Sequence, residues 1–453
     1  MDRLNLYILT FNCARNLVPT DRFASHLFDV LPQSDACPQQ SVAPPELLVL
    51  SLQEIAPIAY AFLGGSLLVP YFDAFRSAVD LAVAKRWSDD DVKYVNVATK
   101  NCGLTGIMVF ARSDQAEKIS WIETAEVGVG VQEMGNKGAV GVRLGYLESD
   151  RGDDTVDLTF VAAHLAPMED AVDRRNEDWR GIVERLVFSK EGPNGGREGM
   201  DETEEQDESA ALLQDPRRSQ SGIFVPTSHL FFAGDLNYRT SDLGPTINDR
   251  ARFPQLNADS DSPVHHSQLL KHDQLTREIQ AQRTLHGLTE APITFAPTYK
   301  YSLEARLAAA EGRQDELKEW KWAKNRWPSW CDRILYLDLP PWMQEGDQIQ
   351  PHGYDALPLF PTSDHRAVAL SVSVPLKPIS PPATANPSDD IRLSPPFAID
   401  RDWHSKRAAA RTKELLVGGL AYLGLTREGN GLLLATTLGV AGGWLVLRSI
   451  FEG

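Results

Sequence analysis

The chain has 453 residues, of which 42% are hydrophobic and 24% are charged, and this balance is typical of a globular protein. Its formal net charge of -17 argues against broad nucleic-acid binding, because a surface that follows phosphate groups normally carries an excess of basic side chains. The cysteines Cys13, Cys37, Cys102 and Cys331 are widely spaced and form neither a CxxC pair nor a disulfide-like framework, so the sequence favours a reducing, cytosolic setting.

The N-terminus predicts a first strand and not a secretory signal, since Asp2 and Arg3 precede a brief alternation that leads into Tyr7–Phe11. Similar short apolar runs recur along the chain, often flanked by turn residues, and each predicts a strand. The runs are Leu6–Phe11, Leu47–Leu52, Gly106–Phe110, Ala139–Leu144, Leu158–Ala163, Leu230–Ala233, Ile334–Leu337 and Ala367–Val374. So many strands exclude a helical bundle.

Two longer stretches, Ala171–Val187 and Leu269–Leu285, predict helices between these strands. Strands and helices together indicate a layered α/β domain. The segment from Lys190 to Ser228 is acidic, polar and rich in glycine, and it predicts a disordered surface insertion (190–228). A second insertion, Ser302–Trp320, has the composition of a helix with a break at Gly312.

The C-terminal part of the chain predicts a linker and a membrane anchor. Proline content makes Pro375–Pro396 a semi-extended linker, so we expect a catalytic domain over 1–374, a linker over 375–403, and a basic segment with a tail anchor over 404–453. The span itself, about Gly429–Leu447, is uncharged between Gly431 and Leu447 and nearly reaches the length that crosses a bilayer.

Positive charge stands on one side of this span. The basic residues before it are Lys406, Arg407, Arg411 and Lys413, and they predict that the N-terminal domain lies in the cytosol. Leu415–Leu425 is a shorter apolar run that fits either the membrane interface or half of a hairpin. The alternative for the main span is a buried helix of a large soluble core.

One strand ends in polar side chains that suggest chemistry. Leu230–Ala233 is apolar, Gly234 ends the strand, and Asp235 and Asn237 follow two residues apart. In extended backbone, residues i and i+2 point to the same side, so both side chains can address one ligand. A plain Asx turn that closes the strand is the alternative.

Polar residues stand at the ends of other apparent strands in the same way. Functional groups on loops that a rigid sheet holds in place are characteristic of active sites. The stretches are Thr10–Asn12, Gln53–Glu54, Gly135–Gly138, Ala163–Leu165, Gly234–Asn237, Trp330–Arg333 and Ser363–His365.

In order and chemistry these stretches resemble the inositol polyphosphate 5-phosphatases of the endonuclease/exonuclease/phosphatase superfamily, with fungal tail-anchored members nearest in architecture. The resemblance covers roughly Leu4 to Val374, and its most specific pieces are Phe232–Arg239, Pro328–Arg333 and Ser363–His365. It implies an α/β fold, a four-layered α/β/β/α sandwich of the DNase I type, followed by a C-terminal transmembrane helix.

Hydrolysis of a phosphate monoester needs an activated water, neutralised phosphoryl oxygens and a stabilised leaving alkoxide. Oxygen ligands suit Mg²⁺, and the resemblance implies Asn12 and Glu54 as its ligands. A zinc site is disfavoured, because no second His or Cys stands at ligand spacing from His164 or His365.

The resemblance also implies the catalytic residues. They are Asp235, Asn237, His365, Asp332, His164 and Asp364. Asp235 orients or deprotonates the attacking water, and Asn237 holds the scissile phosphate. His365 donates to a phosphoryl oxygen while Asp332 fixes its other ring nitrogen. His164 matches a second phosphate-site histidine, and Asp364 lies near the metal or supports its loop.

Cations around the pocket are expected to select the substrate. The substrate-binding residues that the resemblance implies are Asn136, Lys137, Tyr299, Lys300, Lys324 and Arg326, of which the last four grip the 4-phosphate of the inositol ring.

The chain departs from the family pattern at three places. Pro167 and Met168 stand where the family commonly has a further histidine, Ser302 replaces the usual aspartate, and an insertion separates Tyr301 from Lys324. We therefore expect a rearranged 4-phosphate grip with the metal and water-activating positions intact.

The sequence thus predicts magnesium-dependent removal of the 5-phosphate from phosphatidylinositol 4,5-bisphosphate, or from other 5-phosphorylated inositides, at the cytosolic face of a membrane, for which we expect the endoplasmic reticulum. A phosphoinositide lipid and the membrane are the expected partners, and nucleic acid is not. Three alternatives remain at this point: a neutral sphingomyelinase-like phosphodiesterase, a DNA-repair nuclease, and a catalytically silent tether that binds phosphoinositides. The cation cluster disfavours the first, and the net charge and the tail disfavour the second.

Overall fold

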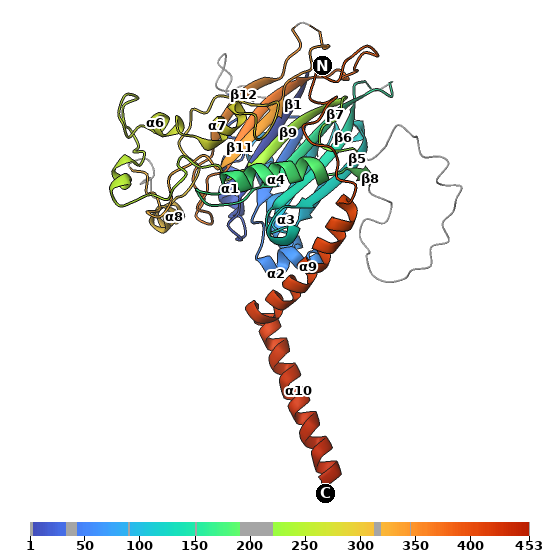
Figure 1. The fold of residues 1–453 in the computed structure, drawn as a ribbon, viewed down its shortest axis with the longest axis vertical. Coiled ribbons are helices and arrows are strands. Elements are labelled where there is room, and N and C mark those ends of the chain that lie inside the picture. The colour runs from blue at the N-terminus through green and yellow to red at the C-terminus, as the bar shows by residue number, and fades with distance from the viewer. Residues whose placement is uncertain are drawn as a thin grey trace, which may run out of the picture.

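The computed structural model describes residues 3–32, 43–88, 91–149, 152–190, 221–311, 319–344 and 346–452. Cys37, Gly312 and residues 191–220 of the predicted disordered insertion (190–228) lie outside these ranges, whereas Ile223 and Phe224 near its end are described and buried. Figure 1 shows two β-sheets packed face to face, helices on their outer surfaces, and a long C-terminal helix that extends away from the domain.

The first sheet has six strands in the order β12-β13-β1-β2-β4-β3. Their bounds are β1 Arg3–Asn12, β2 Leu47–Gln53, β3 Tyr94–Cys102, β4 Thr105–Arg112, β12 Gln350–Ala356 and β13 Val368–Pro375. β1 lies at the centre, antiparallel to β13 from Arg3↔Pro375 and parallel to β2 up to Asn12↔Gln53. The ends of β1 and β2 therefore present Asn12 and Glu54 side by side.

The second sheet has seven strands in the order β10-β11-β9-β7-β6-β5-β8. Their bounds are β5 Ile119–Gly128, β6 Gly138–Leu147, β7 Thr155–His164, β8 Ser189–Lys190, β9 Ser228–Asp235, β10 Leu288–Glu290 and β11 Asp332–Leu337. β7 and β9 are parallel with His164 opposite Asp235, and β11 is antiparallel to β9 with Asp332 opposite Asp235. Three predicted catalytic residues thus meet at one edge of this sheet.

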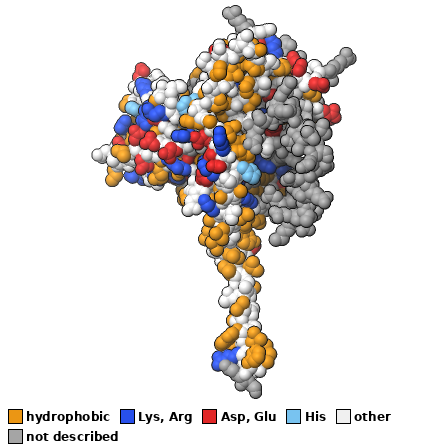
Figure 2. All heavy atoms as spheres, turned by 45° about the vertical axis from the view of Figure 1, so that its right-hand side comes forward, with side chains coloured by type: hydrophobic (Ala, Val, Ile, Leu, Met, Phe, Trp, Pro, Cys, Tyr) orange, Lys and Arg blue, Asp and Glu red, His pale blue; other side chains and the backbone are white. Residues whose placement is uncertain are grey.

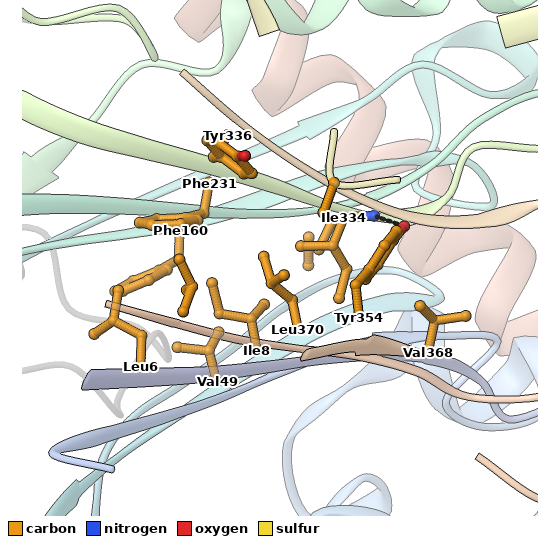
Figure 3. Packing of buried hydrophobic residues seen from close by; sticks show 14 of the residues in the cluster. Leu6, Ile8, Val49, Phe160, Phe231, Ile334, Tyr336, Tyr354, Val368 and Leu370 are labelled. Atoms are coloured by element: carbon orange, nitrogen blue, oxygen red, sulfur yellow. Dashed lines mark hydrogen bonds between the residues drawn. The ribbon is translucent and has the colours of Figure 1, made fainter. Parts of the chain in front are cut away.

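The inner faces of the two sheets form the main hydrophobic core. Figure 3 shows Ile8, Val49 and Leu370 of the six-stranded sheet pointing toward Phe160 and Phe231 of the seven-stranded sheet. All five side chains are buried. This interdigitated layer fixes the spacing of the sheets and hence the position of the strand ends.

Helices cover both outer faces. α1 Thr20–His26, α2 Ile58–Leu63 and α3 Val69–Arg86 pack against the six-stranded sheet, and α4 Val172–Arg185 and α7 Gln274–Gln280 pack against the seven-stranded sheet. The remaining short elements are η1 Gly65–Leu67, η2 Ala116–Lys118, η3 Val131–Glu133, η4 Asn248–Arg252, α6 His266–Leu270 and α8 Leu303–Ala310. The expected four-layered α/β/β/α sandwich is confirmed.

One predicted helix is wrong in its extent. In place of a continuous helix over Leu269–Leu285, the structure has the short helices α6 and α7 with a break between them. Asp273 causes the break: its side chain accepts the Thr276 amide as the N-cap of α7, and it also pairs with the buried guanidinium of Arg333 at 3.0 Å. A continuous helix could not place that carboxylate at a helix start.

The chain after β13, which was predicted as a semi-extended linker, stays in contact with the domain. Ile379 and Arg392 are buried, and the Arg392 guanidinium donates to the carbonyls of Ser228, Leu337 and Asp338. Two helices follow, α9 Trp403–Leu425 and α10 Arg427–Glu452. The ordered protein body therefore extends past the expected boundary at Val374.

Within the part of the chain that the structure describes, one helix is long and apolar enough to cross a membrane. It covers Arg427–Phe451, has a mean hydropathy of 1.5 and is not buried. Its exposure along the whole length argues against the alternative of a buried core helix. Figure 1 shows it projecting from the base of the domain with the C-terminus at its far end.

Candidate active site

Asp235 is the centre of the site. Its Oδ2 accepts a hydrogen bond from Asn12 Nδ2 at 2.8 Å and lies 3.3 Å from His164 Nε2 and 3.9 Å from His365 Nε2. Its Oδ1 accepts the backbone amide of Asn237 at 3.1 Å. Burial opposes the charge on this carboxyl, but the neighbouring His365 and His164 outweigh burial and hold the pKa of Asp235 well below its usual range. The carboxylate is therefore ionised and acts only as an acceptor.

His365 and Asp332 form a buried pair next to it. His365 Nδ1 lies 2.9 Å from Asp332 Oδ2, which also accepts a hydrogen bond from Thr298 Oγ1 at 2.7 Å. Burial disfavours the imidazolium, but the carboxylates of Asp332 and Asp235 more than offset it and raise the pKa of His365 to about 9. With Nδ1 engaged by Asp332, a protonated His365 directs its Nε2 hydrogen toward the side of Asp235.

The turn after β9 is held rigidly. Asn237 has a positive φ of 57°, which asparagine adopts more readily than most residues. Its Nδ2 donates to Leu165 O at 3.1 Å, and Arg239 Nε donates to its backbone carbonyl at 3.0 Å. The Arg239 guanidinium in turn lies over the ring of Tyr299 at 4.5 Å from the centroid. Asn237 is thereby fixed beside Asp235.

Glu54 lies on the other side of the site, directly after β2, with a positive φ of 47°. Its carboxylate is 3.0 Å from Arg15 Nε and 3.9 Å from Lys137 Nζ, and its side chain is 21% exposed. Lys137 is also in contact with the ring of His164. Burial raises the pKa of Glu54, but His164, Lys137 and Arg15 outweigh it, so that the net shift is downward and the group is ionised.

The donor set suits a hard divalent cation. Glu54 offers an ionised carboxylate, Asn12 an amide oxygen, and Asp332 Oδ1 is buried without a hydrogen-bond partner among the described residues. Oxygen donors of this kind select Mg²⁺, Ca²⁺ or Mn²⁺ rather than zinc. Ligand atoms of Asp235, Asp332 and His365 also lie within 4.8 Å of one another, although the His365–Asp332 hydrogen bond already occupies one nitrogen of that group.

The substrate-binding residues that the sequence predicted fall into separate positions around this centre. Lys300 Nζ donates to Asp364 Oδ2 at 2.5 Å, and the ring of Tyr299 packs on that of His365 with centroids 4.4 Å apart. Arg326 reaches Glu169 at 3.8 Å. The remaining two are Asn136, which accepts the Val131 amide, and the exposed Lys324.

A cavity of about 810 Å³ opens beside the catalytic cluster. Asn136, Lys137, Ala166 and Pro167 line its inner end, and η3 and α4 form its sides. Lys137 lines the cavity and also contacts His164 beside Asp235, so the cavity lies next to the site. It offers space for a molecule larger than the phosphate itself.

Two departures from the family pattern now have structural settings. Ser302 is the N-cap of α8, where its side chain accepts the Ala305 amide, so this position serves the second insertion. Met168 has a positive φ of 83°, and its sulfur accepts a hydrogen bond from Arg326 at 3.2 Å. Arg326 is therefore held by Met168 where the family commonly has a histidine.

Several residues at the site escaped the sequence analysis. Thr298 binds Asp332, Ser363 Oγ donates to Asn12 O at 2.6 Å, Arg15 pairs with Glu54, and Arg239 holds Asn237. Ser363 and Arg239 stand inside the quoted motifs, which is a signal that could have found them. Thr298 directly precedes the predicted substrate-binding pair Tyr299 and Lys300, but its contact with Asp332 was not foreseen, and Arg15 carries no such signal.

The comparison with family models agrees with this geometry. A model of the endonuclease/exonuclease/phosphatase family 2 matches residues 9–371, which is well over half of the chain. The chain belongs to this family. The matched region of this family 2 member contains every predicted metal, catalytic and substrate-binding residue.

Individual relatives of this endonuclease/exonuclease/phosphatase family 2 chain are inositide phosphatases. Type II inositol 1,4,5-trisphosphate 5-phosphatase of Mus musculus is 30% identical over 284 residues, which are 62% of this chain and 22% of the relative. Polyphosphatidylinositol phosphatase INP53 of Saccharomyces cerevisiae is 26% identical over 325 residues, which are 72% of this chain and 23% of the relative. The chain thus spans less than a quarter of the length of either relative.

A solved structure shares the fold of this family 2 member. The inositol polyphosphate 5-phosphatase domain of SPsynaptojanin, in complex with inositol (1,4)-bisphosphate and calcium ion, matches with a TM-score of 0.56 at 22% identity. The match covers 82% of this chain and 84% of that one. The expected resemblance to the 5-phosphatases and the expected DNase I-like fold are both confirmed.

Proposed function

We propose that the protein hydrolyses the 5-phosphate of phosphatidylinositol 4,5-bisphosphate, with Mg²⁺, at the cytosolic face of the endoplasmic reticulum membrane. One observation carries the chemistry: an ionised Asp235 lies within 3.9 Å of a histidine that a second carboxylate keeps protonated. Such a pair supplies an acceptor for a water proton and a donor for a phosphoryl oxygen in the same site. The 5-phosphatase relatives support the choice of an inositide.

Each side chain has a role that follows from its contacts. Asp235 accepts the proton of the attacking water, and the hydrogen bonds from Asn12 and from the Asn237 amide fix the direction of its lone pairs. His365 donates its Nε2 proton to the phosphoryl group, while Asp332 stabilises the imidazolium. Burial and Lys137 lower the pKa of His164, whose Nε2 lies 3.3 Å from Asp235 Oδ2 and can donate a hydrogen bond to that carboxylate.

Asn12 and Glu54 would hold the divalent cation, and Asp364 supports the loop next to it through Lys300. When bound, such a cation neutralises phosphate charge and stabilises the leaving alkoxide. Arg15 and Lys137 balance the negative charge of the Glu54 carboxylate. We assign Asn237 to the scissile phosphate, because its turn places it directly beside Asp235.

The head group would contact the cations around the cavity. We assign Lys300, Lys324 and Arg326 with Tyr299 to the 4-phosphate, and Asn136 with Lys137 to the ring near the cavity of about 810 Å³. Arg326 donates to the sulfur of Met168, so the way it would bind the 4-phosphate differs from the family pattern. A lipid is favoured over a soluble inositol phosphate because α10 would keep the enzyme at a membrane.

The orientation follows from charge around α10. The cations at 406, 407, 411 and 413 precede the span, which favours a cytosolic catalytic domain. Protease protection in microsomes tests this: digestion of the domain from the cytosolic side is expected, and protection of the domain would refute the orientation. Cell fractionation tests the choice of the endoplasmic reticulum.

The decisive experiment measures phosphate release from vesicles that contain phosphatidylinositol 4,5-bisphosphate or phosphatidylinositol 4-phosphate, and phosphocholine release from vesicles that contain sphingomyelin, with Mg²⁺ or with a chelator. Wild type is expected to act on the first lipid alone and only with the cation. Asp235→Asn, which keeps the shape but not the charge, is expected to lose about 10²–10⁴-fold in rate. Asp80→Asn, on the exposed side of α3, is the matched control. Activity on sphingomyelin alone, or full activity of Asp235→Asn, would refute the assignment.

A further inference from the structure

Helix α9 has its charged side chains turned toward the protein and its apolar side chains turned outward. Glu414 is fully buried, and Arg407 and Arg411 are partly buried beside it. Leu416 and Leu420, on the opposite side, are 65% and 63% exposed. This is the reverse of a water-facing helix on a soluble protein, in which the polar side faces solvent.

The inward face is firmly docked. Arg407 Nε lies 2.8 Å from a Glu126 oxygen of β5, and its NH1 donates to Glu414 at 2.8 Å. Arg411 NH1 donates to the Phe62 carbonyl at the end of α2 at 2.6 Å. At Gly418 a Cβ atom would lie 2.9 Å from Phe62 Cβ, so only glycine allows the helix to come this close. These contacts fix which side of α9 faces outward.

The exposed side chains of α9 are neutral, and Lys413, which stands three residues before Leu416, directs its ammonium to Gln132 O. From residue 408 to residue 425, every position that the structure describes as exposed is neutral. These positions are Ala408, Ala409, Thr412, Leu415, Leu416, Leu420, Gly424 and Leu425. The four leucines are between 44% and 76% exposed and lie in the last three turns. An unbroken apolar face of this kind marks a surface that a partner covers.

The position of α10 indicates what that partner is. Only Thr426 separates the two helices, and Gly429 packs so closely on Tyr422 O that the turn between them is tight. Leu420 is therefore within about 10 Å, along the helix, of the residue where the apolar span begins. Figure 2 shows hydrophobic side chains gathered where the base of the domain narrows to α10.

We infer that the outward face of α9, formed by Leu415, Leu416 and Leu420, lies in the interfacial region of the same lipid bilayer that α10 enters. This inference rests on the membrane-spanning role proposed for α10. Amphipathic helices bury an apolar face at the boundary of head groups and acyl chains in this manner. α9 then lies between the bilayer and the catalytic domain.

The docked face of α9 also contacts a loop of the candidate active site. Glu414 Oε1 accepts the backbone amide of Gly135 at 2.8 Å, and Lys413 Nζ donates to Gln132 O at 3.4 Å. Both partners belong to the loop that carries Asn136 and Lys137. The membrane surface and the substrate-binding loop are therefore joined through one helix, which holds the cavity at a fixed height above the lipid.

Spin labels on the full chain in phosphatidylcholine–phosphatidylserine vesicles test the depth of α9. Single cysteines replace Leu420, Ser405 and Leu438, in a chain with Cys37→Ser. The other native thiols, Cys13, Cys102 and Cys331, are buried. Ser405 is an exposed position in the first turn of α9, about 22 Å along the helix from Leu420, and serves as the matched control.

The label at 420 is expected to be accessible to oxygen and shielded from a water-soluble nickel chelate, like the label at 438, while the label at 405 is accessible to nickel. A label at 420 that behaves like that at 405, with 438 in lipid, overturns the inference and leaves the anchor intact. Spin–spin coupling between copies at 420 assigns the face to a second chain and also overturns it. A label at 438 in water refutes the anchor and this inference together.

Activity offers an independent readout. The double variant Leu416→Asp/Leu420→Asp is expected to lose about tenfold in hydrolysis of phosphatidylinositol 4,5-bisphosphate in the vesicles, and nothing on soluble inositol 1,4,5-trisphosphate. Ala408→Asp/Ala409→Asp, on the same face but far from α10, is expected to keep both rates. Equal lipid rates for the two double variants would contradict the inference. If wild type hydrolyses neither substrate, the proposed function fails, and the spin labels still decide the depth of α9.

Discussion

Replacement of Asp332 by asparagine tests the central pair of the site. Asp332 Oδ2 lies 2.9 Å from His365 Nδ1, and the carboxylates of Asp332 and Asp235 raise the pKa of His365 to about 9 despite burial. Against the ordinary value of 6.5, that shift corresponds to roughly 3 kcal/mol in favour of the imidazolium. Asp332 is the larger of the two carboxylate contributions, so Asp332→Asn is expected to return the pKa to 6.5 or below.

The rate follows from the fraction of His365 that carries a proton. Wild type keeps the imidazolium up to about pH 9 and loses activity above it. With a pKa near 6.5, only about a tenth of the variant is protonated at pH 7.5, so its kcat/KM falls by about tenfold or more there and recovers at lower pH. The alkaline limb of the profile thus moves down by about 2.5 pH units or more.

The assay is phosphate release from mixed vesicles between pH 5 and pH 10 at saturating Mg²⁺. Thr298→Val is the control, because it removes the other hydrogen bond to Asp332 Oδ2 and leaves the charge in place. Its alkaline limb is expected to stay near that of wild type. If Asp332→Asn and wild type share the same alkaline limb, His365 is not the group whose protonation governs the rate.

Three further outcomes are expected. Glu54→Gln raises the Mg²⁺ concentration for half-maximal activity by at least roughly 10–100-fold in a cation titration, and an unchanged titration would remove Glu54 from the metal site. Burial raises the pKa of Asp178 to about 6, so the ionisation of this carboxyl lowers the free energy of unfolding as the pH rises from 3.8 through 6. In urea unfolding, Asp178→Asn is expected to be as stable as wild type at pH 3.5 and up to about 3 kcal/mol more stable at pH 7.5. Equal stability of the two proteins at both pH values would contradict this. Glu414→Gln removes one of the two carboxylates that pair with Arg407, which lowers the free energy of unfolding by about 1–3 kcal/mol, and it speeds hydrogen exchange at the Gly135 amide. Unaltered exchange would separate α9 from that loop.

The strands that the sequence predicted are the ones buried on both faces. β1, β2, β7 and β9 consist almost wholly of buried residues, and their apolar runs show this directly. The edge strands β3 and β12 escaped prediction, because they are partly exposed and their sequences mix polar and apolar residues without a strict pattern. A strand of this kind is defined by its neighbour and not by its own composition.

The residues of the candidate site also differ in how far the sequence could predict them. Asp235, His164 and Asp332 were predictable, since each ends or begins a buried strand within a distinctive motif. The contacts of Thr298 with Asp332 and of Arg15 with Glu54 were not, because only the folded chain brings these partners near one another. Their sequence neighbourhoods give no indication of those partners.

The C-terminal region shows a third limit of sequence reasoning. Arg407 and Arg411 indicated only a basic segment before a membrane span. In the structure they bind Glu414 and the end of α2, so the helix turns its charges toward the domain. Composition records which residues a helix contains, whereas the direction of each face depends on the surface against which the helix packs.

The pairing of β1 with β13 has a consequence for how the chain folds during synthesis. Leu4 and Val374 are partners in the middle of one sheet, and Ser363 binds Asn12 across the same seam. A growing polypeptide therefore cannot complete this sheet, or assemble Asn12 with His365, until the sequence through β13 has been made. Pairing segments so far apart in the sequence costs conformational entropy and slows folding. The candidate active site therefore forms only late, in a single step. Fragments that stop short of β13 would be inert.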